Sequence, residues 1–449
     1  MPAANQTKPM MRPYLAAAAD FASGKQTPRQ FLEGSLALLE QWEPRIGAFV
    51  CTNLPAARAA AERSTERWRA GKPASPIDGM PVGIKDIIET VDMPTEMGSA
   101  LFAGWRSEKD AACVRALRDA GAVIIGKTVT TEFAASEPRG TRNPWDTART
   151  PGGSSSGSAA SVAAGIASAA LGTQVISSTV RPASYCGCVG FKPSLNALNR
   201  EGSHDIQSQS CTGVLGASLA DVWQVAYEIV ARVGGDAGTA GLQGPEQLPA
   251  AKKPKALAVL ETAGWDVAAA DAKTQFNDCV ARLKSAGVAI RSRHNDKDIA
   301  ALETELLNAT ELSHRCNGFE GQWFFRTMRD RDATKLGRIT LERAYKYDNL
   351  TLAGYRADIK ERARIRGVYA ALAASCDGFI TLAAPGAAPE GLASTGNPEF
   401  GVPSSLLGVP ALSLPLFEDG GMPLGLQLIG FFDADADAVA MASWLMQAK

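Results

Sequence analysis

Pro151-Gly-Gly-Ser-Ser-Ser-Gly-Ser158 is the stretch that decides the fold of this chain. It opens an alanine-rich helix, and small residues dominate the sequence from Gly152 to Pro193. Glycine, alanine and serine let backbone approach backbone and leave little room for bulky side chains. We therefore expect closely packed main chain throughout this region.

Two further segments make chemical sense together with the glycine/serine stretch. Lys85 lies in Gly79-Met-Pro-Val-Gly-Ile-Lys-Asp86, after an apolar, strand-like run, and Ser178 lies in Gly172-Thr-Gln-Val-Ile-Ser-Ser-Thr-Val-Arg-Pro-Ala183. A serine hydroxyl is a weak nucleophile until a neighbouring base takes its proton. Lysine can be that base when burial lowers its pKa enough to keep the amine neutral. The three segments suggest a proton path from Ser178 through Ser154 to Lys85.

The small residues before Ser178 suit an oxyanion hole, because a loop of this kind can aim several backbone N–H groups at one point. Removing one such donor typically costs about 3–4 kcal/mol of barrier. The alternative is that residues 154–158 cap a helix and that Ser177 and Ser178 satisfy a turn. Taken alone, each serine cluster is better explained in that way. The interpretation as a site depends on the lysine and both clusters jointly.

Composition excludes several classes of function. The chain has 449 residues, of which 45% are hydrophobic, and its 46 basic and 47 acidic residues nearly cancel. We therefore expect a large core and neither a nucleic-acid nor a membrane partner. The eight cysteines are scattered, and His204, His294 and His314 form no metal-binding pair, so no metal is expected. Free thiols indicate a cytoplasmic protein.

The order of expected elements indicates an α/β protein, since strands and helices alternate along the chain. Residues 1–70 read as an N-terminal helical segment packing on the core, and 71–449 as a single α/β domain with a mainly helical insertion at about 300–375. Gly234–Lys255 is the best candidate for a linker. The expected strands are Pro81–Ile88, Val123–Ile125, Lys255–Leu260, Gly378–Leu382, Pro410–Pro415 and Gly425–Gly430. The expected helices include one with Pro28 at its first position, Ala56–Trp68, one ending near Asp119–Gly121, Val222–Val233 and Asp271–Ala286.

Two formal motif matches fail on context. Gly121-Ala-Val-Ile-Ile-Gly-Lys-Thr128 fits the phosphate-loop pattern, but a helix precedes its first glycine and its intervening positions are strand-like. Gly153-Ser-Ser-Ser-Gly157 fits the nucleophile elbow with Ser155 as nucleophile. That motif needs an apolar strand before it, whereas the preceding residues 142–151 form a polar loop with two prolines. We favour neither a nucleotide site nor an elbow.

The quoted segments resemble the amidase signature family. Gly126-Lys-Thr128 with Glu132-Phe133, Asn143-Pro144, Gly190-Phe-Lys-Pro193, Gly401-Val-Pro403 and Gly425-Leu-Gln-Leu-Ile-Gly430 also match its motifs. The similarity runs from about residue 27 to the C-terminus. It implies a central mixed sheet with helices on both faces, and a Ser–Ser–Lys triad that cleaves C–N bonds without a cofactor.

The resemblance also assigns roles position by position. Ser178 corresponds to the nucleophile, Ser154 to the bridging serine and Lys85 to the base, and the two serines lie 24 positions apart as in the family pattern. The resemblance places the oxyanion hole at the amides of Val175, Ile176, Ser177 and Ser178.

The chain departs from the family just before Ser178. The family usually has two glycines, or Ala-Gly, where this chain has Ile176-Ser177, and a β-branched Ile tolerates a positive φ poorly. Either the turn has ordinary dihedral angles here or the oxyanion hole is reshaped. Gln174 stands where the family frequently has Asp. One branch of the family also has Gln at this position, and that branch has Arg at the position of Arg181. These changes bear on substrate choice and rate more than on reaction class.

Substrate identity is open at this stage. Aromatic and Met side chains in 315–350 either pack the helices or line a cleft for an aryl group; they are Phe319, Trp323, Phe324, Phe325, Met328, Tyr345 and Tyr347. Amides, aryl esters and carbamates present similar carbonyls, and the chain is similar to urethane-cleaving members of the family. We expect a small-molecule substrate and a monomer or homodimer. The alternatives are a glutamine-hydrolysing subunit of an amidotransferase complex and a non-catalytic scaffold.

Overall fold

A single sheet of 11 strands runs through the molecule. The computed structural model describes residues 8–135, 137–205 and 207–448. The strand order is β1-β3-β2-β4-β6-β5-β10-β11-β9-β7-β8, with both parallel and antiparallel neighbours. The strands are β1 (Phe49–Thr52), β2 (Pro81–Lys85), β3 (Val123–Thr128), β4 (Ala169–Gln174), β5 (Val189–Lys192), β6 (Cys211–Gly216), β7 (Ala256–Val259), β8 (Ala289–Arg291), β9 (Gly378–Leu382), β10 (Ala411–Asp419) and β11 (Met422–Ile429).

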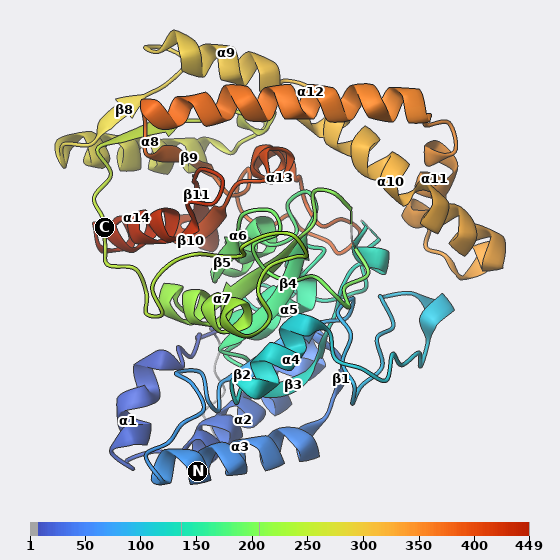
Figure 1. The fold of residues 1–449 in the computed structure, drawn as a ribbon, viewed down its shortest axis with the longest axis vertical. Helices are drawn as coiled ribbons and strands as arrows, with labels where there is room; N and C mark the ends of the chain where they lie inside the picture. The colour runs from blue at the N-terminus through green and yellow to red at the C-terminus, as the bar shows by residue number, and fades with distance from the viewer. Residues whose placement is uncertain (1–7, 136, 206, 449) are drawn as a thin grey trace.

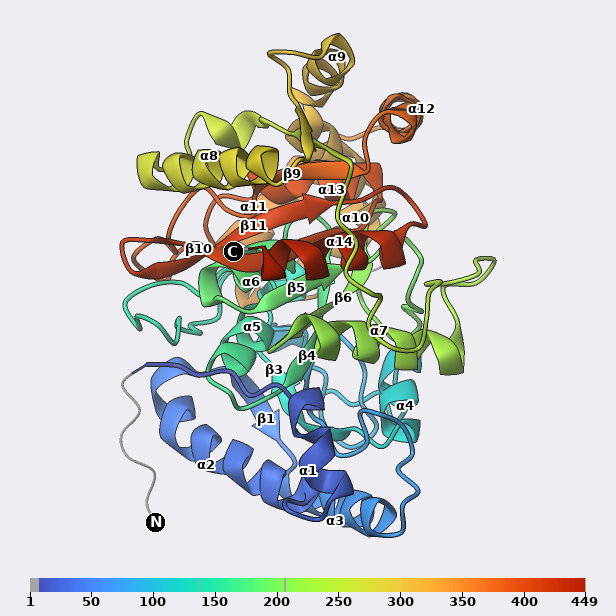
Figure 2. The same ribbon diagram turned by 90° about the vertical axis from the view of Figure 1, so that its left-hand side faces the viewer.

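Helices cover both faces of this sheet, so the predicted mixed α/β architecture is confirmed. In Figure 2, α7, α8 and α14 lie in front of the strands and α5, α6 and α13 lie behind them. The helices are α1 (Ala18–Ala22), α2 (Pro28–Ile46), α3 (Leu54–Arg69), α4 (Ala112–Asp119), α5 (Ser156–Ala163), α6 (Val180–Cys186), α7 (Leu219–Val233), α8 (Ala270–Ser285), α9 (Lys297–Leu306), α10 (Ala309–Asp332), α11 (Arg338–Tyr347), α12 (Leu352–Ala371), α13 (Val402–Leu407) and α14 (Asp435–Gln447).

Two helical regions lie at opposite ends of the sheet. Figure 1 shows α1, α2 and α3 beneath β1 and β3, and α9–α12 across the top and right-hand side. The division into 1–70 and 71–449 stays a prediction, and residues 1–7 and 449 lie outside the described residues. No helix within the described ranges is long and apolar enough to cross a membrane.

Local sequence explains where α2 begins and ends. The Thr27 hydroxyl accepts from the Gln30 amide, the Gln30 side chain accepts from the Thr27 amide, and Pro28 occupies the first helical position. Gly47 ends the helix with φ 55°, a left-handed conformation that suits glycine. The helix start was therefore predictable from these caps.

Strand β2 is shorter than predicted. It ends at Lys85 and not at Ile88, because the amides of Ile87 and Ile88 turn back to the Lys85 carbonyl at 2.8 and 3.0 Å. This turn places the Lys85 side chain at the carboxyl end of a fully buried strand, between the parallel neighbours β3 and β4. Strand ends of this kind are where α/β proteins place functional side chains.

The structure around both rejected motifs agrees with the prediction from their flanking residues, which favoured neither a phosphate loop nor a nucleophile elbow. The phosphate-loop match begins in the turn after α4 and runs along β3, whose residues pair with β1 and β2. Its amides are therefore committed to the sheet. Ser155 follows a loop and not a strand, and its hydroxyl lies buried against the Thr173 carbonyl at 3.3 Å.

The glycine/serine stretch packs as closely as its composition predicts. Every residue of α5 is buried, and the Gly157 amide donates to the Val129 carbonyl at 2.9 Å. A Cβ atom at Gly157 would overlap the Ala48 carbonyl oxygen and the Val129 amide nitrogen. Both are main-chain atoms that cannot rotate away, so this position requires glycine.

Gly157→Ala is expected to destabilise the protein by about 1–3 kcal/mol, the usual cost of overpacking a core. The matched control is Gly367→Ala on the exposed surface of α12, where a Cβ atom meets nothing within 4 Å. Replacing glycine by alanine inside a helix stabilises by roughly 0.5–1 kcal/mol. Thermal unfolding of both variants checks the pair, and equal melting temperatures would contradict the packing argument.

Candidate active site

Lys85 and Ser154 form a direct hydrogen bond in the interior. The Lys85 Nζ atom lies 2.7 Å from Ser154 Oγ and 2.7 Å from Thr173 Oγ1. The lysine comes from the end of β2, the serine from the loop before α5 and the threonine from β4. Three neighbouring elements therefore converge on one amine.

The lysine is held in conditions that favour its neutral form. Its side chain is fully buried, and removal from water lowers the pKa of Lys85 from 10.5 to about 8. The negative charge of Asp205 acts in the opposite direction and raises this pKa. At a pKa near 8, a substantial fraction of the amine is neutral at mildly alkaline pH.

Ser154 is fixed by main-chain contacts on both sides. The Ser154 carbonyl accepts from the Thr131 amide at 3.2 Å, and the Gly153–Ser154 peptide is cis. The carbonyl of Gly153 accepts from Arg181 Nη2 at 2.7 Å. Arg181 is itself buried, and its guanidinium also binds the Gly396 carbonyl and Thr395 Oγ1 at 2.7 and 3.0 Å. Arg181 thus ties the loop of Ser154 to the segment 395–396.

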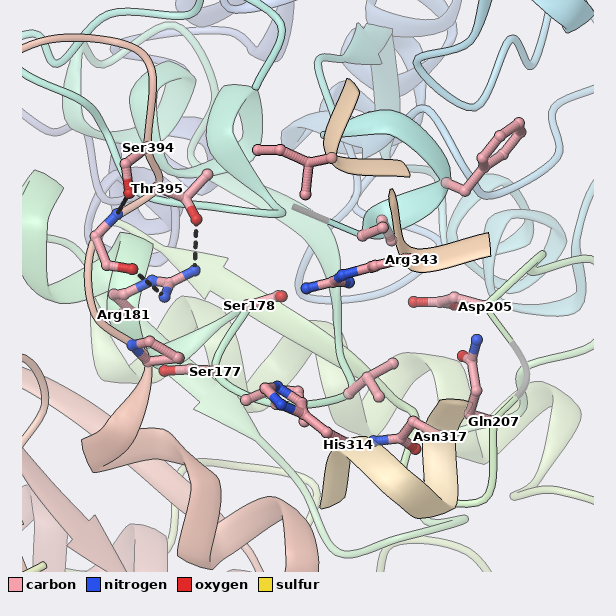
Figure 3. Close-up of a pocket in the computed structure, with 18 of the residues that line it drawn as sticks. Ser177, Ser178, Arg181, Asp205, Gln207, His314, Asn317, Arg343, Ser394 and Thr395 are labelled. Carbon is pink, nitrogen blue, oxygen red and sulfur yellow. Dashed lines mark hydrogen bonds between the residues drawn. The ribbon is translucent and has the colours of Figure 1, made fainter. Parts of the chain in front are cut away.

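Ser178 lies on the loop that leaves β4, and it faces a cavity. Its side chain is half-buried and lines the same cavity as Val175, Ile176 and Ser177. Figure 3 shows its hydroxyl pointing into the open space between Arg181 and Asp205. Within the described residues no hydrogen bond joins Ser154 to Ser178. The structure therefore brings together Lys85 and Ser154, the serine predicted to be the bridge, and it leaves the Ser178 hydroxyl on the cavity side.

Gln174 shapes the loop from its base. Its Oε1 accepts from the amides of Thr179 and Val180 at 2.9 and 3.0 Å, and its Nε2 lies 3.0 Å from Ser405 Oγ. The same Ser405 hydroxyl donates to the Ile176 carbonyl at 2.7 Å. With Gln174 in place of the frequent Asp, one side chain closes the turn and also reaches α13.

The turn before Ser178 keeps ordinary dihedral angles, which decides between the two alternatives left by the sequence. Neither Ile176 nor Ser177 has a positive φ, so a β-branched residue is tolerated here. In the part of the chain that the structure describes, the four amides of residues 175–178 have no hydrogen-bond acceptor. Ser177 is buried and faces Gly401, where a Cβ atom would overlap it.

The cavity in front of Ser178 has a volume of about 220 Å³ and draws its wall from five regions of the chain. These are the loop after β3, residues 175–181, the loop that carries Asp205 and Gln207, the helices α10 and α11, and the segment 393–398 (Figure 3). Its lining residues are Phe133, Ala134, Ala135, Val175, Ile176, Ser177, Ser178, Arg181, Asp205, Gln207, His314, Asn317, Phe325, Ile339, Arg343, Tyr347, Ala393, Ser394, Thr395, Gly396 and Pro398.

The aromatic residues of the insertion divide between the two roles that the sequence left open. Phe325 and Tyr347 line the cavity, and Phe324 packs edge-on against Phe133 at a ring separation of 5.1 Å. Trp323 and Tyr345 are 76% and 56% exposed and contribute nothing to the cavity wall.

Two carboxylates hold the insertion against the core at this point. Glu132 Oε2 accepts from the Gly337 amide at 2.8 Å, and Glu137 Oε2 accepts from the Ile339 amide at 2.7 Å. Both amides lie at the start of α11, where a helix has unpaired N–H groups. The contacts orient α11 so that residues 339, 343 and 347, on one face of it, line the cavity.

A model of the family described as amidase matches residues 30–437. The chain belongs to the amidase family. It is 31% identical over 92% of its length to a glutamyl-tRNA(Gln) amidotransferase subunit from Anaeromyxobacter sp. (strain K), of which 91% is covered. The subunit of the same name from Chloroflexus aggregans is 45% identical over 193 residues, which are 42% of this chain and 40% of that relative.

Solved structures agree with the family assignment. A crystal structure of an amidase superposes with a TM-score of 0.81 at 27% identity, covering 97% of this chain and 99% of the other. The peptide amidase of Stenotrophomonas maltophilia shares the fold, with a TM-score of 0.76 at 24% identity over 97% of this chain and 96% of that one. The amidase assignment identifies the chain as a hydrolase of amide C–N bonds.

Seven polar residues of the cavity were not found from the sequence of this amidase: Asp205, Gln207, His314, Asn317, Arg343, Ser394 and Thr395. They lie outside the motifs and come from two loops and from α10 and α11. The only available signal was the polar run 203–210, which has too little periodicity for a helix or strand. Their shared location depends on how the insertion docks, which local sequence does not encode.

Gln174→Met is expected to lower turnover at least about tenfold, because it leaves two buried amides unpaired and frees the loop that carries Ser178. The control is Gln224→Met, which removes another buried glutamine hydrogen bond, to Glu228 on α7. Both variants should lose stability, but only the first should lose kcat. Steady-state kinetics and thermal unfolding measure the two effects, and an unchanged kcat in Gln174→Met would refute the role given to this side chain.

Proposed function

We propose that the chain is a serine hydrolase that cleaves amide or carbamate (urethane) C–N bonds, and aryl esters, through an acyl-enzyme on Ser178. The observation that carries the proposal is the 2.7 Å contact between the buried Lys85 amine and Ser154, behind a cavity that Ser178 faces. In this assignment Ser178 is the nucleophile, Ser154 the bridge and Lys85 the base.

The proton path begins with a neutral lysine. Its lone pair accepts a hydrogen bond from the Ser154 hydroxyl while one of its N–H groups donates to Thr173 Oγ1, and both contacts are 2.7 Å long. As Ser178 Oγ attacks the carbonyl carbon, its proton passes to Ser154 and the proton of Ser154 passes to Lys85. When the tetrahedral intermediate collapses, the C–N bond breaks and the same relay returns a proton to the leaving amine. Water then repeats the sequence on the acyl-enzyme.

The oxyanion would be held by amides of residues 175–178. Support comes from their lack of acceptors within the described residues and from their position on the cavity wall. Fixed donors of this kind stabilise the charge that develops in the transition state, and they need no reorganisation. The hydrogen bonds of Gln174 and Ser405 keep the loop in this shape.

The choice among amide, carbamate and aryl ester is set by the groups on either side of a common carbonyl. Phe325 and Tyr347 offer aromatic surface near Ser178, which suits an aryl substituent. We therefore propose aryl amides and aryl carbamates as the preferred substrates. A cytoplasmic location and a monomeric or homodimeric state stay predictions, as does the independence from cofactors.

Ser178→Ala and Lys85→Met should each abolish hydrolysis of an anilide, with losses of about a thousandfold or more, while the fold is kept. Initial rates measured with purified protein, together with circular dichroism, test this. A fluorophosphonate probe should label Ser178 in the wild type and not in Ser178→Ala. Ser155→Ala is the control for a neighbouring serine outside the cavity. Wild-type turnover in Ser178→Ala would refute the assignment of Ser178 as the nucleophile. If the probe fails to label the wild-type protein, the non-catalytic scaffold is favoured.

The pH dependence follows from the buried base. Lys85 must be neutral to accept a proton, and its pKa is about 8, so kcat/KM should rise with pH through about 8. Asp205 raises this pKa by favouring the charged amine. Asp205→Asn should therefore move the rising limb to lower pH. A pH–rate profile measures the shift, and Glu137→Gln serves as the control, a carboxylate that is not among the residues lining the cavity. A limb that moves to higher pH in Asp205→Asn would contradict the electrostatic account.

A second candidate is the glutamine-hydrolysing subunit of an amidotransferase complex. The observation that favours it is similarity over nearly the whole chain to relatives named as subunits of glutamyl-tRNA(Gln) amidotransferase, at 30–31% identity. Glutamine hydrolysis and a copurifying partner would support this candidate. A hydrolysis panel of anilides, p-nitrophenyl esters, carbamates and glutamine with the purified single chain separates the two candidates.

A further inference from the structure

One side of the cavity carries buried polar atoms that have no partner among the described residues. They are Asp205 Oδ2, Gln207 Oε1 and both side-chain polar atoms of Asn317. Asp205 is only 2% and Asn317 only 9% exposed, yet all three residues line the cavity. Figure 3 shows Asp205, Gln207 and Asn317 together on the side opposite Arg181. We call these three residues the acceptor wall.

The acceptor wall is held in place by the surrounding structure. Asp205 Oδ1 accepts from the Ser203 hydroxyl at 2.8 Å, which leaves Oδ2 without a partner among the described residues. Beyond Gln207, the Ser208 amide donates to Glu320 on α10 at 2.7 Å, and Arg362 on α12 donates to the Ser208 hydroxyl at 2.8 Å. Because α10 also carries Asn317, the contact between Ser208 and Glu320 fixes the loop relative to that residue.

The unpartnered atoms are mainly acceptors. Three of them are oxygens, against the one donor nitrogen of Asn317. A buried polar group without a partner is destabilising, so a ligand that supplies the missing hydrogen bonds binds more tightly than one that does not. The wall therefore favours a ligand that donates hydrogen bonds, and it disfavours an apolar one.

The charges around the cavity indicate that this donor is uncharged. Arg181 and Arg343 both line the cavity and outnumber the single carboxylate of Asp205. His314 adds no third positive charge near neutral pH, since burial and the nearby charges of Arg343 and Lys346 lower its pKa. A cation entering this cavity would meet a net positive lining, whereas a neutral N–H or O–H group would not.

We propose that the acceptor wall binds a second group of the substrate, a neutral hydrogen-bond donor such as the N–H of another amide or carbamate, a hydroxyl or an aryl amine. This inference rests on the proposed function for Ser178 as the reacting atom, and it deepens that function by naming a feature of the substrate. A substrate with two donor-bearing ends would place one carbonyl at Ser178 and its second N–H at Asp205, Gln207 and Asn317.

The test uses three nearly isosteric anilides that differ in one para substituent: methyl, amino and aminomethyl. At the pH of the assay the amino group is neutral and the aminomethyl group is cationic. The set is made twice, with the substituent on the amine ring and on the acyl ring. In wild-type protein, kcat/KM for the amino compound should exceed that for the methyl compound about ten- to hundred-fold in one of the two sets. For the aminomethyl compound, kcat/KM should exceed that of the methyl compound by a smaller factor.

Asn317→Leu and Gln207→Met should erase most of this preference, because each should raise KM for the amino compound more than KM for the methyl compound. Asp205→Asn is measured well above pH 8, where its effect on Lys85 no longer limits the rate. Ser394→Ala removes a hydroxyl from the opposite wall and should keep the preference. Equal kcat/KM for the methyl and amino compounds in both sets, or a preference that survives Asn317→Leu and Asp205→Asn, would overturn the proposal.

Binding separates this inference from the proposed function. Calorimetry on Ser178→Ala with the same compounds should show tighter binding of the amino compound, and the added Asn317→Leu change should remove that difference. If Ser178→Ala still turns over anilides, the proposed function fails while the binding preference can stand. If Ser178→Ala is inactive but binds all three compounds equally, the acceptor wall has no such role and the proposed function stands.

Discussion

The burial of one amine organises this molecule. Lys85 ends a central strand, is fully shielded from water and meets the hydroxyls of Ser154 and Thr173 at 2.7 Å. A protonated lysine in such a place loses most of its hydration, so its pKa falls and the neutral form that the proposed function needs as a base becomes more populated. The arrangement is possible only because three elements remote in sequence close around the amine.

Small side chains make that closure possible. Bulky residues in α5 or in the turn before it would separate the loop of Ser154 from β2 and β4. Gly157 touches the main chain of Ala48 and Val129, and Gly172 faces Ser155, so the backbone segments lie almost in contact. The glycine/serine stretch therefore contributes chemistry at Ser154 and supplies the packing that brings Lys85 within hydrogen-bond distance.

Sequence alone predicted the α/β class, the helices with clear caps and the strands with β-branched or long apolar runs. It did not predict β4, whose Ala-Ala-Leu-Gly-Thr-Gln sequence lacks the usual strand residues, or β6, which contains glycines and polar groups. These strands form because their neighbours bury them on both sides, a tertiary effect that local propensity does not contain. For the candidate site, motif, spacing and the family resemblance predicted Lys85, Ser154 and Ser178, and their roles stay predictions. The opposite wall was missed, because Asp205 and Asn317 come to line one cavity only after α10 packs on the loop 207–209.

Because α11 packs against the core as a separate element, the groups proposed to react and much of the cavity wall lie on different parts of the chain. The proposed reacting groups lie on the sheet and its tight loops, whereas much of the cavity wall belongs to α10 and α11. Glu132 and Glu137 attach this wall to the core through two amides at the start of α11. Substitutions on the cavity faces of those helices change neither the strand order nor the surroundings of the amine. This separation allows substrate specificity to change while the reaction stays the same. Protein engineers could therefore vary specificity by exchanging α10 and α11.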